Sequence, residues 1–300
     1  ALSGAIRIGR ETGAAVEIAH YKAQGADNWH LAAEGLALVD RARAGGVDVT
    51  TDMYPYLAGS SGLVSMLPQW AQEGGVDATL ARLADGPTRD KMAAAMQSTG
   101  FFRSYSWDQI LIAESPKKRA YEGRYVSELA AEAGKGATDW VFDALTETGL
   151  HVQMIAFYAC EENLRMQLAH PHMMVGTDGS GRSTKGPLSK GKPHPRSYGT
   201  FPRILGRYVR EQGVISLEEA VRKMTSLPAS KLRWPDRGLI RVGFKADLVV
   251  FDPDTVIDTA TFEAPHQYPV GIHHVLVNGK PVVDQGRHTG ARPGMVLGRR

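Results

Sequence analysis

The chain begins with a repeated pattern in which a helix ends at glycine and a short apolar strand follows. Residues 1–12 have helical apolar spacing and stop at Gly13, and residues 15–19 have the composition of a buried strand. The spacing predicts a second helix over 29–44 and a second strand over 47–51. Helices that alternate with buried strands are typical of a parallel sheet, so the pattern predicts an α/β fold with a TIM-like (β/α)8 barrel.

Polar side chains stand where these predicted strands end. His20 and Lys22 follow the first strand, Asp52 follows the second, and a later apolar strand at 173–175 runs into Asp178. Each alone has an ordinary explanation, as a turn residue, a satisfied histidine or a solvated charge. Together they stand at the carboxyl ends of parallel strands, where such folds place their chemistry. We therefore expect His20 and Asp178 to face one metal site.

The metal that this pair favours is zinc. A catalytic zinc uses protein ligands, an open position for water, and a carboxylate that takes the proton of that water. Zinc lowers the pKa of the bound water to about 7, so hydroxide attacks an amide carbonyl at neutral pH. Asp178 is then the group that accepts the proton and later passes it to the leaving nitrogen.

After Asp52 the regular alternation stops. Residues 54–62 are predicted to form a rigid turn and a small-residue loop, and the segment that follows is mostly helical, with one strand at 109–112. This connection is too long for a βα unit, which indicates an inserted lid. A further buried strand is predicted at 152–157, and more strands in the tail. We predict barrel units at 1–64, a lid or small domain at 65–150, final barrel units at 151–235, and a small β-sandwich module at 236–300.

The composition is that of an ordinary soluble protein. Charged residues make up 22% of the chain and the net charge is +3, with the basic residues scattered, so we expect neither nucleic acid nor a membrane as a partner. No apolar run approaches the ~20 residues of a membrane span, and residues 1–10 lack the pattern of a signal peptide. The one cysteine, Cys160, excludes an intrachain disulfide, and we expect an inert buried thiol in a cytoplasmic protein.

Two loop motifs follow Asp178. The glycine-rich loop that follows it does not match a phosphate-binding loop, because Arg182 stands where that motif needs lysine. Farther on, prolines bracket His194 and Arg196 and fix the direction of the backbone. An arginine held this way suits bidentate binding of a carboxylate. A structural ion pair accounts for it nearly as well, and the residues alone leave both open.

Several short motifs run through nearly the whole chain. They are the residues at 18–22, 52–56, 175–179, 193–203, 243–252 and 275–279. With these motifs the chain resembles the carboxyl-terminal part of the N-acyl-D-amino-acid deacylases, or D-aminoacylases, of the amidohydrolase superfamily. The tail motifs are shared by many amidohydrolases, whereas Tyr54-Pro55-Tyr56 and Pro193-His194-Pro195-Arg196 are much narrower.

The resemblance implies zinc-dependent hydrolysis of the amide bond of an N-acyl-D-amino acid, which gives a carboxylate and a free D-amino acid. His20 matches the family's zinc-ligating histidine, and Asp178 matches its catalytic aspartate, which we also count as a metal ligand. The preference for D over L rests on the resemblance alone. The substrate, a small-molecule N-acyl amino acid, is expected to contact Lys22, Tyr54, Ser60, His194 and Arg196.

The chain lacks part of the family's metal site. The early His-x-His pair, the metal-ligating cysteine and a further histidine have no counterpart, since His170 and His172 precede the Asp178 strand rather than end one. Because a catalytic zinc usually has three protein ligands, we expect the amino-terminal half of the barrel to be absent from this chain. Two alternatives stay open. One is a cyclic-amide hydrolase that resembles hydantoinase or dihydroorotase, and the other is a non-catalytic fragment that needs a partner chain to supply that half.

Overall fold

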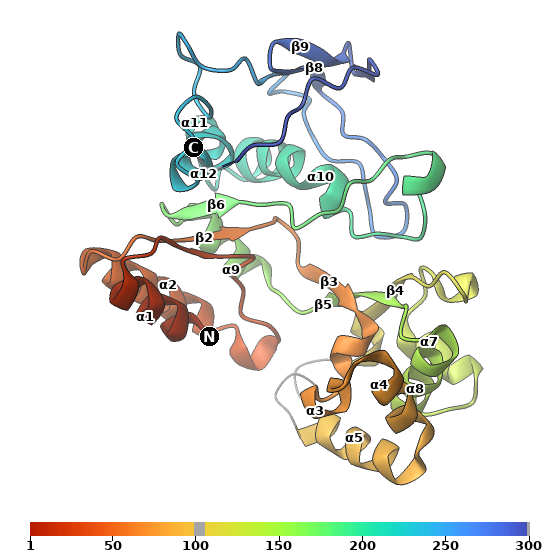
Figure 1. Cartoon of the computed structure of the whole chain (residues 1–300). Coiled ribbons are helices and arrows are strands. Elements are labelled where there is room, and N and C mark those ends of the chain that lie inside the picture. Colours follow the sequence, from red (N-terminus) through yellow and green to blue (C-terminus); the bar gives the residue numbers. More distant parts are fainter. Residues whose placement is uncertain (99–105, 299–300) are drawn as a thin grey trace.

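A parallel sheet brings the predicted strand ends together (Figure 1). The computed structural model describes residues 1–98 and 106–298 and has a mixed α/β fold, as predicted. The sheet order is β1 (Val16–Ile18), β2 (Val49–Met53), β6 (Met173–Val175), and both pairings are parallel. β2 is central and largely buried, as expected for a parallel strand that is covered on both faces. The carboxyl ends of the three strands therefore lie side by side.

Helices cover both faces of this sheet, as Figure 1 shows. On one face lie α1 (Leu2–Thr12), α2 (Leu31–Ala44) and α9 (Glu161–Ala169). On the other lie α10 (Arg196–Arg203), the π-helix that continues it (Ile204–Glu211), α11 (Leu217–Met224) and α12 (Ser226–Lys231). The helices predicted at 1–12 and 29–44 are confirmed as α1 and α2.

α1 ends at the glycine that the sequence indicates. Gly13 has a φ of 70°, in the left-handed region that favours glycine, and its N–H donates to the Gly9 carbonyl. A Cβ on Gly9 would lie 2.8 Å from Val16 Cγ2. The close approach of α1 to β1 therefore requires a residue without a side chain at this position. Buried Ile6 and Val39 fill the small core beneath it.

An antiparallel sheet begins where a loop was predicted. β3 (Ala58–Gly62) pairs with β5 (Gln153–Phe157), which also pairs with β4 (Ile110–Glu114). The prediction of a loop at 58–62 is wrong, because small residues have low β-propensity and the pairing with β5 overrides it. β5 lies in the segment expected to supply final barrel units, but it pairs within this separate sheet. The predicted domain boundaries themselves stay a prediction.

The helices predicted between 65 and 150 pack on this antiparallel sheet. Their buried apolar side chains, among them Met92, Phe142 and Leu145, form one core cluster with the inner faces of β4 and β5. Within the described ranges, no helix is long and apolar enough to cross a membrane. The helices of this segment are α3 (Gln69–Gln72), α4 (Gly75–Ala84), α5 (Gly86–Ser98), α7 (Val126–Glu132) and α8 (Ala137–Thr148).

The tail forms a four-stranded antiparallel sheet in the order β10–β9–β8–β7. The strands predicted in the tail are confirmed as β7 (Leu248–Phe251), β8 (Ile272–Val277) and β9 (Lys280–Asp284), and the structure adds β10 (Arg287–His288). In β7, Val249 and Val250 are 55% and 49% exposed to solvent. Among the residues described, these strands pair only with one another, so a β-sandwich stays a prediction.

Candidate active site

His20, Asp52 and Asp178 come together at the edge where β1, β2 and β6 end. The His20 backbone N–H donates to Asp52 Oδ1 at 2.7 Å, and the Tyr21 N–H donates to the Asp52 carbonyl at 2.8 Å. Burial raises the pKa of Asp52, and the charge of Asp178 raises it further, so these two carboxylates are within electrostatic range. The strand ends meet, as the sequence pattern predicts.

The two residues predicted to bind the metal share an unusual backbone conformation. His20 has a φ of 39° and Asp178 a φ of 45°, both in the left-handed region. Such a conformation costs a non-glycine residue about 1–3 kcal/mol and recurs at functional sites, where the surrounding structure imposes it. At His20 the imposing contact is the hydrogen bond to Asp52.

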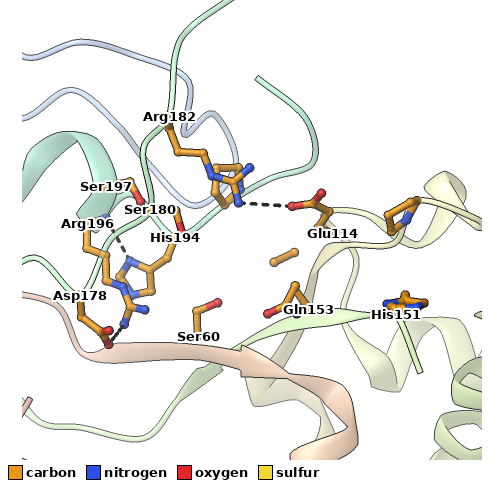
Figure 2. A pocket seen from close by; sticks show the side chains of 13 residues that line it. Ser60, Glu114, His151, Gln153, Asp178, Ser180, Arg182, His194, Arg196 and Ser197 are labelled. Carbon is orange, nitrogen blue, oxygen red and sulfur yellow. Dashed lines mark hydrogen bonds and ion pairs between the residues drawn. The ribbon is translucent and has the colours of Figure 1, made fainter. Parts of the chain in front are cut away.

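Arg196 forms an ion pair with Asp178. Its Nη1 lies 2.9 Å from Asp178 Oδ2, and Figure 2 shows the two side chains pointing toward one another. The Arg196 side chain is only 8% exposed, whereas that of Asp178 is 42% exposed. The guanidinium carbon also lies 4.5 Å from the centroid of the Tyr54 ring, within the range of a cation–π contact. A buried cation therefore links two of the predicted site residues.

Lys22 approaches the same tyrosine. Its ammonium hydrogen-bonds with the hydroxyls of Tyr54 and Tyr158, the latter at 3.2 Å, and lies 3.8 Å from the centroid of the Tyr54 ring. Burial, and after it the positive charge of Arg196, lowers the pKa of Lys22 to about 7. Tyr158 was not predicted as a site residue, because it lies 136 positions from Lys22 and no local pattern marks it.

His194 holds the backbone of this site with both ring nitrogens. Nδ1 accepts the Arg196 N–H at 3.1 Å, which places the proton on Nε2, where it donates to the Ala58 carbonyl at 3.0 Å. Burial, and then the charge of Arg196, lowers the pKa of His194 well below its usual value, so the ring is neutral. It packs edge-on against Tyr54, with centroids 5.7 Å apart. Substrate binding by His194 stays a prediction, while these contacts give it a positioning role.

A second network fixes the loop that carries Tyr54. Arg203 Nε donates to the Pro55 carbonyl at 2.9 Å, and its Nη1 lies 3.1 Å from Asp258 Oδ2. The Tyr56 hydroxyl donates to the same carboxylate oxygen at 3.2 Å. Asp258 belongs to the tail, so this buried carboxylate couples the tail to the Tyr54 loop.

Four of the predicted site residues line one cavity of about 590 Å³: Asp178, His194, Arg196 and Ser60. The cavity extends from Asp178, beyond the end of β6, to the antiparallel sheet, where Glu114 and Gln153 line it (Figure 2). Lys22 and Tyr54 line a separate cavity of about 20 Å³. Arg196 thus contacts predicted residues of both cavities, Asp178 in the larger one and Tyr54 in the smaller one.

The described residues fit part of a zinc site. His20 and Asp178 offer one nitrogen and one carboxylate donor beside Asp52, a donor set that suits zinc. Over residues 1–98 and 106–298, however, no group of three His, Cys, Asp or Glu side chains is placed to hold a metal ion. His170 and His172 lie at the start of β6, where His170 Nε2 is 3.0 Å from Asp40 Oδ1, and so do not complete the set.

The comparisons with known proteins assign the family. A model of the amidohydrolase family matches residues 11–283, and the chain therefore belongs to this family. The D-aminoacylase of Alcaligenes xylosoxydans xylosoxydans is 38% identical over 299 residues, which are 100% of this chain and 52% of that protein. The N-acyl-D-glutamate deacylase of the same organism is also 38% identical, over 100% of this chain and 51% of that protein.

A solved structure gives the same assignment. The N-acyl-D-glutamate deacylase from Bordetella bronchiseptica, complexed with zinc and a phosphonate inhibitor, is 35% identical with a TM-score of 0.77. The match covers 99% of this chain and 52% of that one. The resemblance stated from the motifs is confirmed, and the chain spans about half the length of the relatives it matches.

Proposed function

We propose that this chain is the carboxyl-terminal part of a zinc-dependent hydrolase that cleaves the amide bond of N-acyl-D-amino acids. The observation that carries the proposal is the grouping of Lys22, Tyr54 and Arg196 beside Asp178. A substrate of this class has a carboxylate and an amide a few bonds apart. The group supplies cations for the carboxylate and a proton acceptor for the amide chemistry.

Arg196 and Lys22 bind the carboxylate of the substrate. Both cations contact the Tyr54 ring, and each is largely removed from water. The charge of Arg196 opposes the protonation of Lys22, and an anion bound between them relieves that repulsion. Charge-assisted hydrogen bonds from such cations are about twice as strong as neutral ones, and a guanidinium binds a carboxylate in a fixed bidentate geometry.

Asp178 moves the proton. One of its oxygens accepts the proton of the attacking water while the water oxygen adds to the amide carbonyl. The C–N bond then breaks, and the same proton passes to the leaving nitrogen, which gives a carboxylate and a free amino acid. Arg196 fixes the orientation of this carboxylate through Oδ2. Zinc, with His20 and Asp178 among its ligands, would supply a water of lowered pKa.

We place the remaining zinc ligands outside this chain, in the amino-terminal half of the barrel. That half, joined to this chain or supplied by a partner, would complete the metal site. It would also add the second layer that makes the tail sheet a β-sandwich. Two observations support this arrangement, the partial donor set and the roughly half-length match to the relatives.

The test measures release of free D-amino acid from N-acetyl-D-amino acids by the complete protein that contains this chain. We expect turnover that is lost with a chelator, restored by zinc, and absent with the L enantiomers. If the protein hydrolyses a hydantoin but releases no free amino acid from any N-acyl amino acid, it is instead a cyclic-amide hydrolase. In equilibrium dialysis, the 300-residue chain alone should not bind zinc stoichiometrically. Tight binding would contradict the placement of ligands outside it.

A further inference from the structure

A second ion pair lines the cavity that holds Asp178 and Arg196. Arg182 Nη2 lies 3.3 Å from Glu114 Oε2, and Figure 2 shows this pair across the cavity from Asp178. Within this chain, the proposed hydrolysis uses one proton acceptor and the cations that bind the substrate carboxylate. The Arg182–Glu114 pair takes no part in either task.

Loop contacts fix the position of this second pair. Arg182 belongs to the loop after Asp178, and its Nη1 donates to the Lys190 carbonyl at 3.3 Å. The same loop joins β4, where the Lys192 N–H donates to the Ala113 carbonyl at 2.6 Å, next to Glu114. The side chains of Arg182 and Glu114 are 20% and 23% exposed, so both charges face the cavity more than bulk water.

The pair has hydrogen-bonding capacity left for a ligand. A guanidinium has more N–H donors than the contacts with Lys190 and Glu114 use, and a carboxylate accepts more than one hydrogen bond. Glu114 repels a ligand carboxylate and Arg182 repels an ammonium group. A neutral amide, with one acceptor and one donor, satisfies both members without adding charge.

We propose that Arg182 and Glu114 form a distal subsite that selects substrates whose far substituent is an uncharged amide. This inference rests on the proposed function and names the substrate class of that site. The substituent is the amino-acid side chain or the acyl group, whichever extends from the scissile amide toward β4. Gln153 lines the same wall and adds a further amide to it.

The first experiment compares kcat/KM for N-acetyl-D-glutamine, -norleucine, -glutamate and -lysine with the complete zinc-loaded protein. We expect glutamine to exceed each of the others by about tenfold, since one or two hydrogen bonds are gained without a repelled charge. A parallel series varies the acyl group on D-alanine with the same four end groups. A preference for the amide in either series supports the subsite, and a preference for norleucine or its acyl counterpart in both overturns it.

The second experiment removes the charges of Glu114 and Arg182 one at a time. Glu114→Ala leaves Arg182 unopposed, so preference should shift at least tenfold toward the acidic substrate relative to the basic one. Arg182→Ala should shift it by a similar factor in the opposite direction. Glu147→Ala is the matched control, because it removes an exposed ion pair with Lys118, 3.0 Å long, away from the cavity. This control should leave the ratios unchanged.

Each ratio comes from one enzyme preparation, so a variant that is partly unfolded still gives a valid value. Unchanged ratios in both variants would show that the pair is only structural and would overturn the inference, while deacylation itself continued. Loss of the proposed function has a different signature, namely no zinc-dependent release from any N-acyl-D-amino acid by the unmodified protein. That result would overturn the proposed function and the subsite together.

Discussion

Arg196 Nη1 lies 2.9 Å from Asp178 Oδ2, although these two residues come from different elements of the fold. Asp178 follows β6, and Arg196 begins α10 after a long loop. Both side chains line the cavity, and the Arg196 side chain is 8% exposed whereas that of Asp178 is 42% exposed, so the carboxylate is the more accessible member of the pair. The ion pair thereby orients the Asp178 carboxylate, the proposed proton acceptor, without closing it off from the cavity.

Replacing Asp178 with asparagine should abolish proton transfer while keeping the shape of the side chain. We expect kcat to fall by about 10²–10⁴, because a positioned general base contributes about that factor. Steady-state kinetics and the zinc content of the purified protein are measured together, since Asp178 is also a predicted zinc ligand. A variant that retains zinc and loses less than tenfold in kcat would rule out this role.

Arg196→Met should act on substrate binding. Loss of a buried charge-assisted contact of about 2–3 kcal/mol predicts a KM about 100-fold higher. Arg196→Lys keeps the charge but not the planar guanidinium, so its KM should lie between that of the unmodified protein and that of Arg196→Met. Equal KM values for the methionine variant and the unmodified protein would place the substrate carboxylate elsewhere.

Asp258→Asn tests the network that fixes the Tyr54 loop. It removes the charge that pairs with the partly buried Arg203, and we expect the free energy of unfolding to fall by about 2 kcal/mol. KM should rise as well, because Tyr54 loses its fixed position. Urea unfolding with the Arg203→Met single variant and the double variant completes a mutant cycle. Strictly additive losses would show that the two side chains are not coupled.

Lys223 should make stability depend on pH. This fully buried lysine on α11 donates to the Met173 carbonyl at 3.0 Å, and burial lowers its pKa to about 8. In the unfolded chain its pKa is about 10.4, so between these values the unfolded state binds more protons. The free energy of unfolding attributable to Lys223 therefore rises with pH from about 8 to about 10.4, and it is lost as pH falls through about 8.

Lys223→Met measures this contribution. Urea unfolding of both proteins at several pH values isolates it, because all other titrating groups are shared. We expect the difference in unfolding free energy between the two proteins to grow as pH rises through that interval. Parallel curves would mean that the pKa of Lys223 is not lowered in the folded state.

The sequence predicts those parts of the site that adjoin strand ends. His20, Lys22 and Asp178 follow apolar strands, and parallel pairing necessarily brings such positions to one edge. β3 was missed because an Ala-Gly-Ser-Ser-Gly segment has almost no intrinsic strand preference and depends on its partner β5.

The contacts that complete the site could not be predicted, because they join distant residues. Lys22 and Tyr158 are 136 positions apart, and Arg203 and Asp258 are 55 apart. A charged or aromatic residue in a loop gives no periodic signal, so only the folded chain shows its partner. The expectation that this chain carries only part of the metal ligands rests on the motifs alone, and it stays a prediction.

Gly59, in the middle of β3, places a limit on how this protein can be changed. A Cβ at this position would lie 1.8 Å from the Tyr158 hydroxyl, the group that contacts Lys22. Larger β-branched residues would usually strengthen such a strand. Here any of them must displace Tyr158, and with it Lys22, which we propose binds the substrate carboxylate. Under the proposed function, stabilising substitutions at this position of β3 and retention of substrate affinity are therefore opposing goals.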